Sequence, residues 1–208
     1  MKRIISALLI VITAVSLCAC SSGSTQSTVA TSAFDTSTQS TTSPVDPVRK
    51  SKLMTWKVKI NGHSFTVPFE VSKLKKLGFE YKKSGTIEPG KYSIGVYPEN
   101  DKGRILTSQL WNPTDSPLEY KDCKVGQIKI GLGEGFKVEL PEGIKFNKKC
   151  TVDLLKKTYG EPDNFIKGKN YYVLKYHVGV YQFIEFFLYK EERMQKYSSL
   201  TIENFSFE

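Results

Sequence analysis

Hydrophobic and polar residues alternate in short runs along most of the chain after residue 55. A period of two places alternate side chains on one face, so the pattern predicts half-buried β-strands. The first run, residues 56–67, is interrupted by Asn61-Gly62, a pair typical of a tight hairpin turn because both turn positions need positive φ. Later runs predict strands at residues 91–99, 104–112, 118–123, 125–132, 136–141, 171–178, 181–189 and 199–207.

Two segments follow a helical pattern instead. Residues 71–79 carry leucines three positions apart, and Gly78 can end a short helix by adopting the left-handed conformation. The second segment is TVDLLKKTYGEPD, residues 151–163. It begins with Thr151, a good N-cap, and Gly160 ends its helical pattern. The predicted fold class is therefore α+β, a mainly antiparallel sheet with two short helices.

The chain repeats part of this pattern. FTVP followed by SKLKKLG corresponds to VELP followed by DLLKKTYG, and strands come after both. Each copy combines a strand ending in Pro, a short Leu-Lys-Lys helix closed by Gly, and antiparallel strands. The repeat predicts a tandem duplication with halves at residues 49–135 and 136–208, whose sheets are shared or stacked.

The first twenty residues differ from the rest. MKR supplies two positive charges, and the fourteen residues IISALLIVITAVSL that follow carry none, which is typical of a secretory signal. The run is shorter than the roughly 20 apolar residues of a membrane span. Cys18 and Cys20 come next, and a metal site is disfavoured because no His or further Cys follows within forty residues. The alternative is an ordinary secreted protein, in which neither Cys18 nor Cys20 has a role.

The segment LCAC resembles the bacterial lipoprotein signal, which has Leu three residues before an invariant Cys and a small residue directly before it. Leu17, Ala19 and Cys20 occupy those positions. The resemblance implies a signal peptide at residues 1–19, cleavage between Ala19 and Cys20, and a diacylglyceryl group on the Cys20 thiol. Two or more acyl chains hold a protein stably at a membrane. The expected location is the outer, extracytoplasmic face of the cell membrane.

Residues 20–48 are predicted to form a flexible linker behind this anchor. Fifteen of the 28 residues in 21–48 are Ser or Thr, and the apolar residues are too few to bury a core. A linker of this length spans about 30 Å on average. Residues 49–208 are then enough for one extracytoplasmic α+β domain.

The domain is strongly basic. From Arg49 onward it has 28 Lys and Arg residues against 19 Asp and Glu residues. A basic surface favours anionic partners, which outside a bacterial membrane are phospholipid headgroups, teichoic acids and other wall polymers, or an envelope protein. The export signal argues against nucleic acid. The alternative is a soluble surface with surplus lysine. The lysines gather in KLKKLGFEYKK, FNKKC, LLKKTYG and IKGK.

A second resemblance concerns TVDLLKKTYGEPD. It is similar to the helix–Gly–x–Pro element of small envelope lipoproteins of the SmpA/OmlA type and of β-lactamase-inhibitor-protein-like domains. The match covers residues 140–165, and the extra helix that precedes this one in the inhibitor fold is missing. The wider pattern of signal, Ser/Thr linker and hairpin resembles lipoproteins of low-GC Gram-positive bacteria. The resemblance implies a binding or scaffold protein and carries no catalytic residues.

Groups able to perform chemistry are few in the domain. Cys123 and Cys150 are candidates for one disulfide in an oxidising compartment, and the alternative is two buried free thiols. His63 and His177 lack the spacing of a metal motif, and no nucleophile motif is present. The sequence therefore predicts neither a metal nor a cofactor.

Aromatic residues and lysines are the remaining candidates for ligand contacts. Trp56 and Trp111 can stack on sugars or contact a polymer, and Lys156 and Lys157 place charge on the second predicted helix. The alternative assigns the aromatic residues to the core and to cross-strand pairs. The predicted function is a non-enzymatic binding or scaffold module at the cell envelope. The rival hypotheses are an envelope hydrolase whose site forms only in the fold, and a protein inhibitor.

Overall fold

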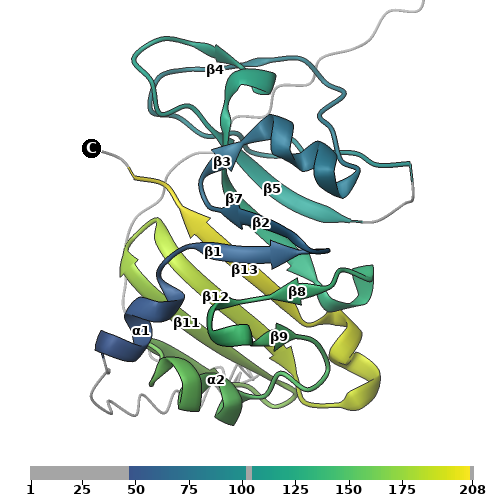
Figure 1. The fold of residues 1–208 in the computed structure, drawn as a ribbon, viewed down its shortest axis with the longest axis vertical. Coiled ribbons are helices and arrows are strands. Elements are labelled where there is room, and N and C mark those ends of the chain that lie inside the picture. The colour runs from purple at the N-terminus through teal and green to yellow at the C-terminus, as the bar shows by residue number, and fades with distance from the viewer. Residues whose placement is uncertain (1–46, 102–104, 207–208) are drawn as a thin grey trace, which may run out of the picture. The chain divides into compact units, whose positions relative to one another are not determined.

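The computed structural model describes residues 47–101 and 105–206, which belong to one compact unit (Figure 1). The predicted signal peptide, the lipidation site Cys20 and the linker up to residue 46 lie outside the described residues. No helix in the described ranges is long and apolar enough to cross a lipid bilayer.

A seven-stranded antiparallel sheet, called the large sheet here, forms one layer (Figure 1). Its strand order is β10-β11-β12-β13-β7-β3, and β5 also pairs with β7. The three aromatic-rich runs near the end of the chain form β11, β12 and β13, as predicted. The strands are β3 (Phe69–Glu70), β5 (Leu106–Trp111), β7 (Lys124–Gly131), β10 (Asn164–Lys167), β11 (Tyr171–Gly179), β12 (Gln182–Tyr189) and β13 (Ser199–Asn204).

A second antiparallel sheet of four strands, the small sheet, has the order β2-β1-β8-β9. The predicted hairpin at its edge is confirmed, because Asn61 and Gly62 have φ values of 50° and 87° and join β1 to β2. A two-stranded sheet of β4 (Thr86–Ile87) and β6 (Leu118–Glu119) completes the set. The strands of the small sheet are β1 (Lys57–Ile60), β2 (His63–Thr66), β8 (Val138–Glu139) and β9 (Lys145–Phe146).

The two predicted helices are both present. The first is the 3-10 helix η1 (Val71–Leu77), which ends at Gly78 with φ 80° and ψ 25°. The second is the α-helix α2 (Val152–Tyr159), whose N-cap Thr151 accepts a hydrogen bond from the backbone of Leu154 at 3.2 Å. An unpredicted α-helix, α1 (Pro47–Leu53), begins within the last residues assigned to the linker. Shorter 3-10 turns are η2 (Tyr120–Asp122), η3 (Leu132–Glu134), η4 (Pro141–Gly143) and η5 (Glu192–Tyr197).

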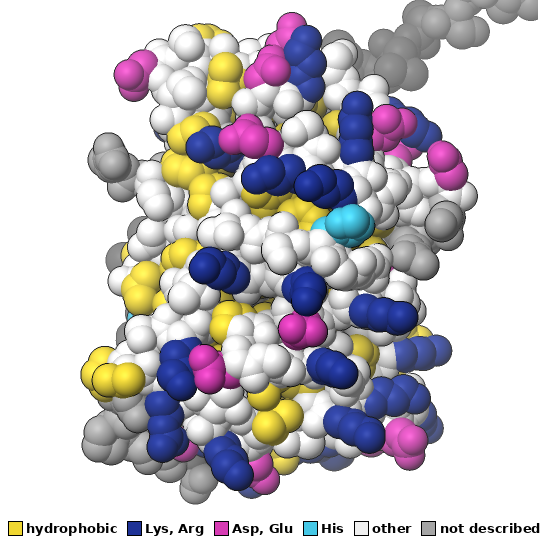
Figure 2. Space-filling view, in the orientation of Figure 1, with side chains coloured by type: hydrophobic (Ala, Val, Ile, Leu, Met, Phe, Trp, Pro, Cys, Tyr) yellow, Lys and Arg dark blue, Asp and Glu magenta, His cyan; other side chains and the backbone are white. Residues whose placement is uncertain are grey.

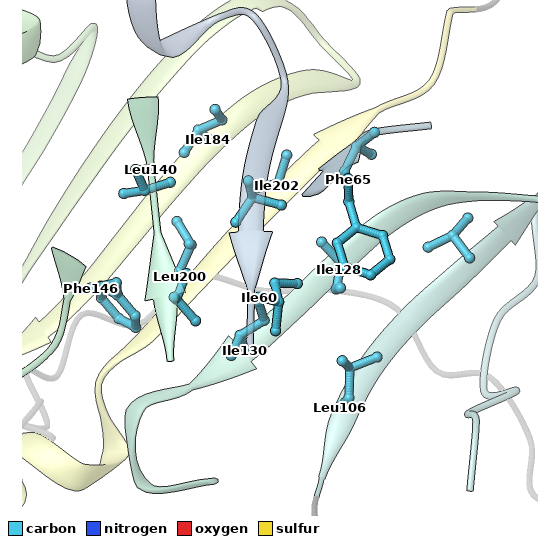
Figure 3. Packing of buried hydrophobic residues seen from close by; sticks show 14 of the residues in the cluster. Ile60, Phe65, Leu106, Ile128, Ile130, Leu140, Phe146, Ile184, Leu200 and Ile202 are labelled. Carbon is cyan, nitrogen blue, oxygen red and sulfur yellow. The ribbon is translucent and has the colours of Figure 1, made fainter. Parts of the chain in front are cut away.

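The core lies between the two larger sheets and beneath α2. Figure 3 shows side chains of β1, β7, β12 and β13 meeting in this layer, together with Leu140, which follows β8. Tyr159 of α2 and Tyr176 of β11 are fully buried, and their rings meet edge to face at 6.4 Å. Their hydroxyl groups donate to the carbonyl oxygens of Pro141 at 2.6 Å and Gly160 at 3.0 Å. Each buried hydroxyl therefore has a hydrogen-bond partner, which offsets the cost of burying it where α2 packs.

The antiparallel α+β class is confirmed, but one predicted strand is wrong and another is shorter than expected. Residues 91–99 form only isolated bridges, Tyr92 with Trp111 and Glu80 with Glu99. The hydroxyl oxygen of Ser93 accepts a hydrogen bond from the backbone amide of Leu110 at 2.9 Å. A side chain thus replaces part of the backbone hydrogen bonding between strands here. Residues 118–123 contain a strand of two residues followed by the turn η2.

The predicted tandem duplication is not shown by these elements. Strands of both predicted halves contribute to the large sheet and to the small sheet. The helix of the first half is 3-10, whereas the helix of the second half is α.

Candidate anion-binding pocket

The four residues predicted to contact a ligand lie in different environments. Trp111 is only 5% exposed and meets the ring of Phe205 edge-on at 6.0 Å, so burial removes it from the candidates. Trp56 is partly buried against the core, at a φ of 59°. Lys157 is exposed on α2. Only Lys156 lines a pocket, and the structure does not bring the four together.

Cys123 and Cys150 are both buried and free, so the candidate disulfide is not formed and the alternative of two free thiols describes this structure. Burial raises the pKa of the Cys150 thiol to about 12. Burial, helped by the charge of Asp122, raises the pKa of Cys123 to about 11. A thiolate is the reactive form, so burial disfavours the reactive form of both cysteines at neutral pH.

A pocket of about 410 Å³ opens between the start of α2 and the adjoining ends of β10, β11 and β12. Its charged lining comes from several separate clusters of the sequence. Lys148 comes from the cluster FNKKC, Lys156 from LLKKTYG and Lys167 from IKGK. Lys190, at the end of β12, is a fourth basic residue, and Asp153 on α2 is the one acidic residue of the lining. We call this the α2 pocket.

Two stacked aromatic rings form part of the pocket wall. Phe165 on β10 and Tyr172 on β11 lie 5.9 Å apart, at an interplanar angle of 12°. The ammonium of Lys156 lies 4.3 Å from the centroid of the Phe165 ring, and that of Lys190 lies 4.6 Å from the Tyr172 ring. Cation–π contacts of this kind fix the direction of a flexible lysine without neutralising its charge.

Lys156 and Lys190 also interact with oxygen atoms. Lys156 forms an ion pair with Glu161 at 2.7 Å. Lys190 donates to the backbone carbonyl oxygens of Gly168 at 2.6 Å and Lys169 at 3.0 Å. Carbonyl oxygens carry no net charge, so Lys190 keeps its full positive charge at the pocket.

Lys148 and Lys167 differ from this pair because both are exposed. Within the described ranges, neither has a carboxylate within 4.0 Å. Their ammonium groups are therefore free to take up an anion at the rim of the pocket. The arrangement therefore supplies positively charged groups that can bind an anion.

The two histidines of the domain are not among the residues that line this pocket. His63 on β2 and His177 on β11 are exposed and belong to different sheets. Glu203 has a raised pKa, but β12 separates it from His177, which places the two backbones about 10 Å apart. Among the described residues, no group of three His, Cys, Asp or Glu side chains could hold a metal ion.

Sequence reasoning missed the individual roles of Lys148, Lys167, Lys190, Phe165 and Tyr172. Three of the pocket's lysines belong to clusters that the charge pattern identifies. Their convergence depends on how α2 packs against the sheet, which the pattern does not contain. No family model, curated protein or solved structure matches this chain.

Proposed function

We propose that this protein is a lipid-anchored lipoprotein of the outer face of the cell membrane, and that its domain is a non-enzymatic module that binds an anionic polymer of the envelope. The observation that carries the proposal is the convergence of lysines from three separate sequence clusters on the α2 pocket. Lys156 is already paired with Glu161, so Lys148, Lys167 and Lys190 supply the positive charge that attracts an anion.

The pocket favours a phosphate-type anion. Lys148 and Lys167 supply compact ammonium charges at the rim, and such groups pair well with phosphate oxygens. Lys190 adds a third charge, held in place by carbonyl oxygens. Asp153 offsets only one of these charges.

A second area rich in lysine supports a polymer as the ligand. The small sheet borders two further hollows of about 670 Å³ and 400 Å³. Their lining includes Lys57, Lys59, Lys137 and Lys145, with Glu139 and Glu142 as acidic neighbours. Figure 2 shows Lys and Arg side chains spread over this face, with fewer Asp and Glu side chains between them. Lys145 is only three residues before Lys148 in the chain, so a long polyanion can contact both areas.

Co-sedimentation of the full-length protein with purified cell envelopes tests the proposal. The salt concentration is varied, and the envelopes are used before and after removal of anionic wall polymers. We expect binding that falls steeply with salt and disappears with the polymers. Binding that survives removal of the polymers would contradict the proposal.

A double variant assigns the binding to the α2 pocket. Two exposed charge contacts of about 0.7 kcal/mol each correspond to a tenfold loss, so Lys148→Gln with Lys167→Gln should weaken envelope binding about tenfold. The matched control replaces two exposed lysines elsewhere, Lys73→Gln with Lys83→Gln, and changes the net charge equally. Equal losses in the two double variants would show that only net charge matters.

A further inference from the structure

Another hollow of about 390 Å³ lies on the opposite face of the large sheet, and its lining shares only Tyr189 with that of the α2 pocket. On β13, Leu200 and Ile202 belong to the buried core, so Ser199 and Thr201 point to the other side, which we call the outer face. Ser199 lines the hollow together with Lys129 of β7. The turns η3 and η5 border it at one end.

Aromatic side chains occupy outer-face positions at this end of the sheet. On β12, Phe186 and Leu188 are buried, whereas Phe187 and Tyr189 alternate to the outer face and line the hollow. Phe187 meets Tyr189 at 5.2 Å, and Tyr189 meets Tyr197 of η5 at 6.4 Å. Tyr197 is 55% exposed, so much of its ring faces solvent.

Close backbone packing positions Tyr197. A Cβ atom on Gly133 of η3 would lie 2.7 Å from the carbonyl oxygen of Lys196, so only glycine lets η3 approach η5 this closely. The approach places the exposed ring of Tyr197 beside the polar groups of β5 and β7 that also line the hollow.

The polar side of the hollow is positively charged. Lys129 and Lys196 have no carboxylate within 4.0 Å among residues 47–101 and 105–206. Glu134 is the acidic residue of the lining, and one of its oxygens accepts the backbone amide hydrogen of Ile105 at 2.8 Å. The ammonium of Lys196 lies 4.9 Å from the centroid of the Tyr197 ring, which places positive charge beside the aromatic surface.

We propose that this hollow binds a sugar residue that carries a carboxylate. A sugar ring has an apolar C–H face and a rim of hydroxyl groups. The C–H face fits the ring of Tyr197, because an aromatic face carries partial negative charge and the C–H groups partial positive charge. The hydroxyl rim can form hydrogen bonds with Thr107 and Ser199. The carboxylate can pair with the ammonium groups of Lys129 and Lys196. The site does not depend on the α2 pocket.

Ligand-observed NMR on the full-length protein in detergent tests this proposal, with trigalacturonate as the acidic probe and maltotriose as the neutral one. We expect saturation transfer to the C–H protons of trigalacturonate and much weaker transfer to maltotriose. Tyr197→Ala should weaken trigalacturonate binding about tenfold, whereas Tyr197→Phe retains the ring and most of the binding. Lys196→Gln should reduce the preference for the acidic sugar.

Two controls make the result specific. Tyr181→Ala removes another exposed tyrosine, at the far end of β12, and should leave binding unchanged. The Lys148→Gln, Lys167→Gln double variant should also bind trigalacturonate as the wild type does. The proposal is overturned if the wild type shows no transfer, if both sugars bind equally, or if Tyr197→Ala binds like the wild type. Self-association of the protein through this face, measured by light scattering, would also overturn it.

Discussion

Glu203 is a carboxyl group on the outer face of β13 that is only 7% exposed. Phe183 of β12 and Gln127 of β7 lie on either side of it. The side-chain amide of Gln127 donates a hydrogen bond to the carboxylate. Burial raises the pKa of Glu203, while the Gln127 hydrogen bond and the charge of Lys175 oppose part of that rise.

This raised pKa makes stability depend on pH. Because the folded-state pKa of Glu203 exceeds the unfolded value, the folded protein binds the proton more tightly. Proton binding by Glu203 stabilises the folded protein fully at pH values below the ordinary carboxyl pKa. This stabilisation is lost as the pH rises through the higher pKa of the folded state. Glu203→Gln removes this titration. We expect it to raise the unfolding free energy at neutral pH by up to about 1 kcal/mol, and to flatten its decline with rising pH.

Urea denaturation across an acidic-to-neutral pH series measures the effect of Glu203→Gln. Glu88→Gln is the control, because Glu88 is exposed and lies outside the large sheet. A decline in stability with pH that is as steep in Glu203→Gln as in the wild type would contradict the assignment to this residue.

At the scale of elements, α2 connects stability to the proposed binding site. Its N-cap hydroxyl, on Thr151, accepts the amide hydrogen of Leu154, and its side chains Asp153 and Lys156 line the α2 pocket. Tyr159, at its last position, anchors the helix to Pro141 through the hydroxyl group. The same eight-residue helix therefore shapes the pocket wall and fills part of the core.

Thr151→Ala removes the N-cap hydrogen bond and should lower the unfolding free energy by about 1 kcal/mol. Thr151→Ser retains the hydroxyl, so its stability should stay close to that of the wild type. Chemical denaturation of the three proteins provides the measurement. Equal losses in the Ala and Ser variants would point to packing of the Thr methyl group as the cause.

At the scale of the whole molecule, α1 is the first element of the described domain, and it lies next to α2. Lys50 of α1 forms an ion pair with Asp163, just beyond α2, at 2.7 Å. The two side chains are only 15% and 17% exposed, so this pair is more than a surface contact. In the proposed lipoprotein, the linker thus joins the domain beside the C-terminal end of α2.

Cys20→Ala tests the anchor itself. If Cys20 carries the acyl chains, this variant should move from the detergent-rich phase to the aqueous phase in a cloud-point extraction, because two acyl chains supply the membrane affinity. Cys18→Ala is the matched control and should stay in the detergent-rich phase. Equal partition of the two variants would contradict lipidation at Cys20.

Much of the fold could be predicted from local pattern. Asn61-Gly62 specified the hairpin through its need for positive φ, and Thr151 with Gly160 delimited α2. Residues 91–99 carry the same alternation but have no strand to pair with along their length. Strand formation needs a partner as well as a pattern, so local sequence overestimated the sheet there.

Less of the candidate site could be predicted. Lys156 was identified from its place on a basic helix, and it does line the α2 pocket. Trp111 was a candidate because tryptophan often contacts ligands, but β5 places it inside the molecule, 5% exposed. A large aromatic residue suits a core and a binding surface equally well, so its type alone does not choose between them.

The sequence by itself determined the alternation that makes antiparallel strands, the turn at Asn61-Gly62 and the excess of lysine, because each depends on residues close together in the chain. Only the tertiary structure decided that Lys148, Lys156 and Lys167 line one pocket and that Tyr197 and Lys129 line one hollow. These groupings join residues from different strands and turns. They arise from how sheets and helices pack to bury their apolar faces, which no local pattern specifies.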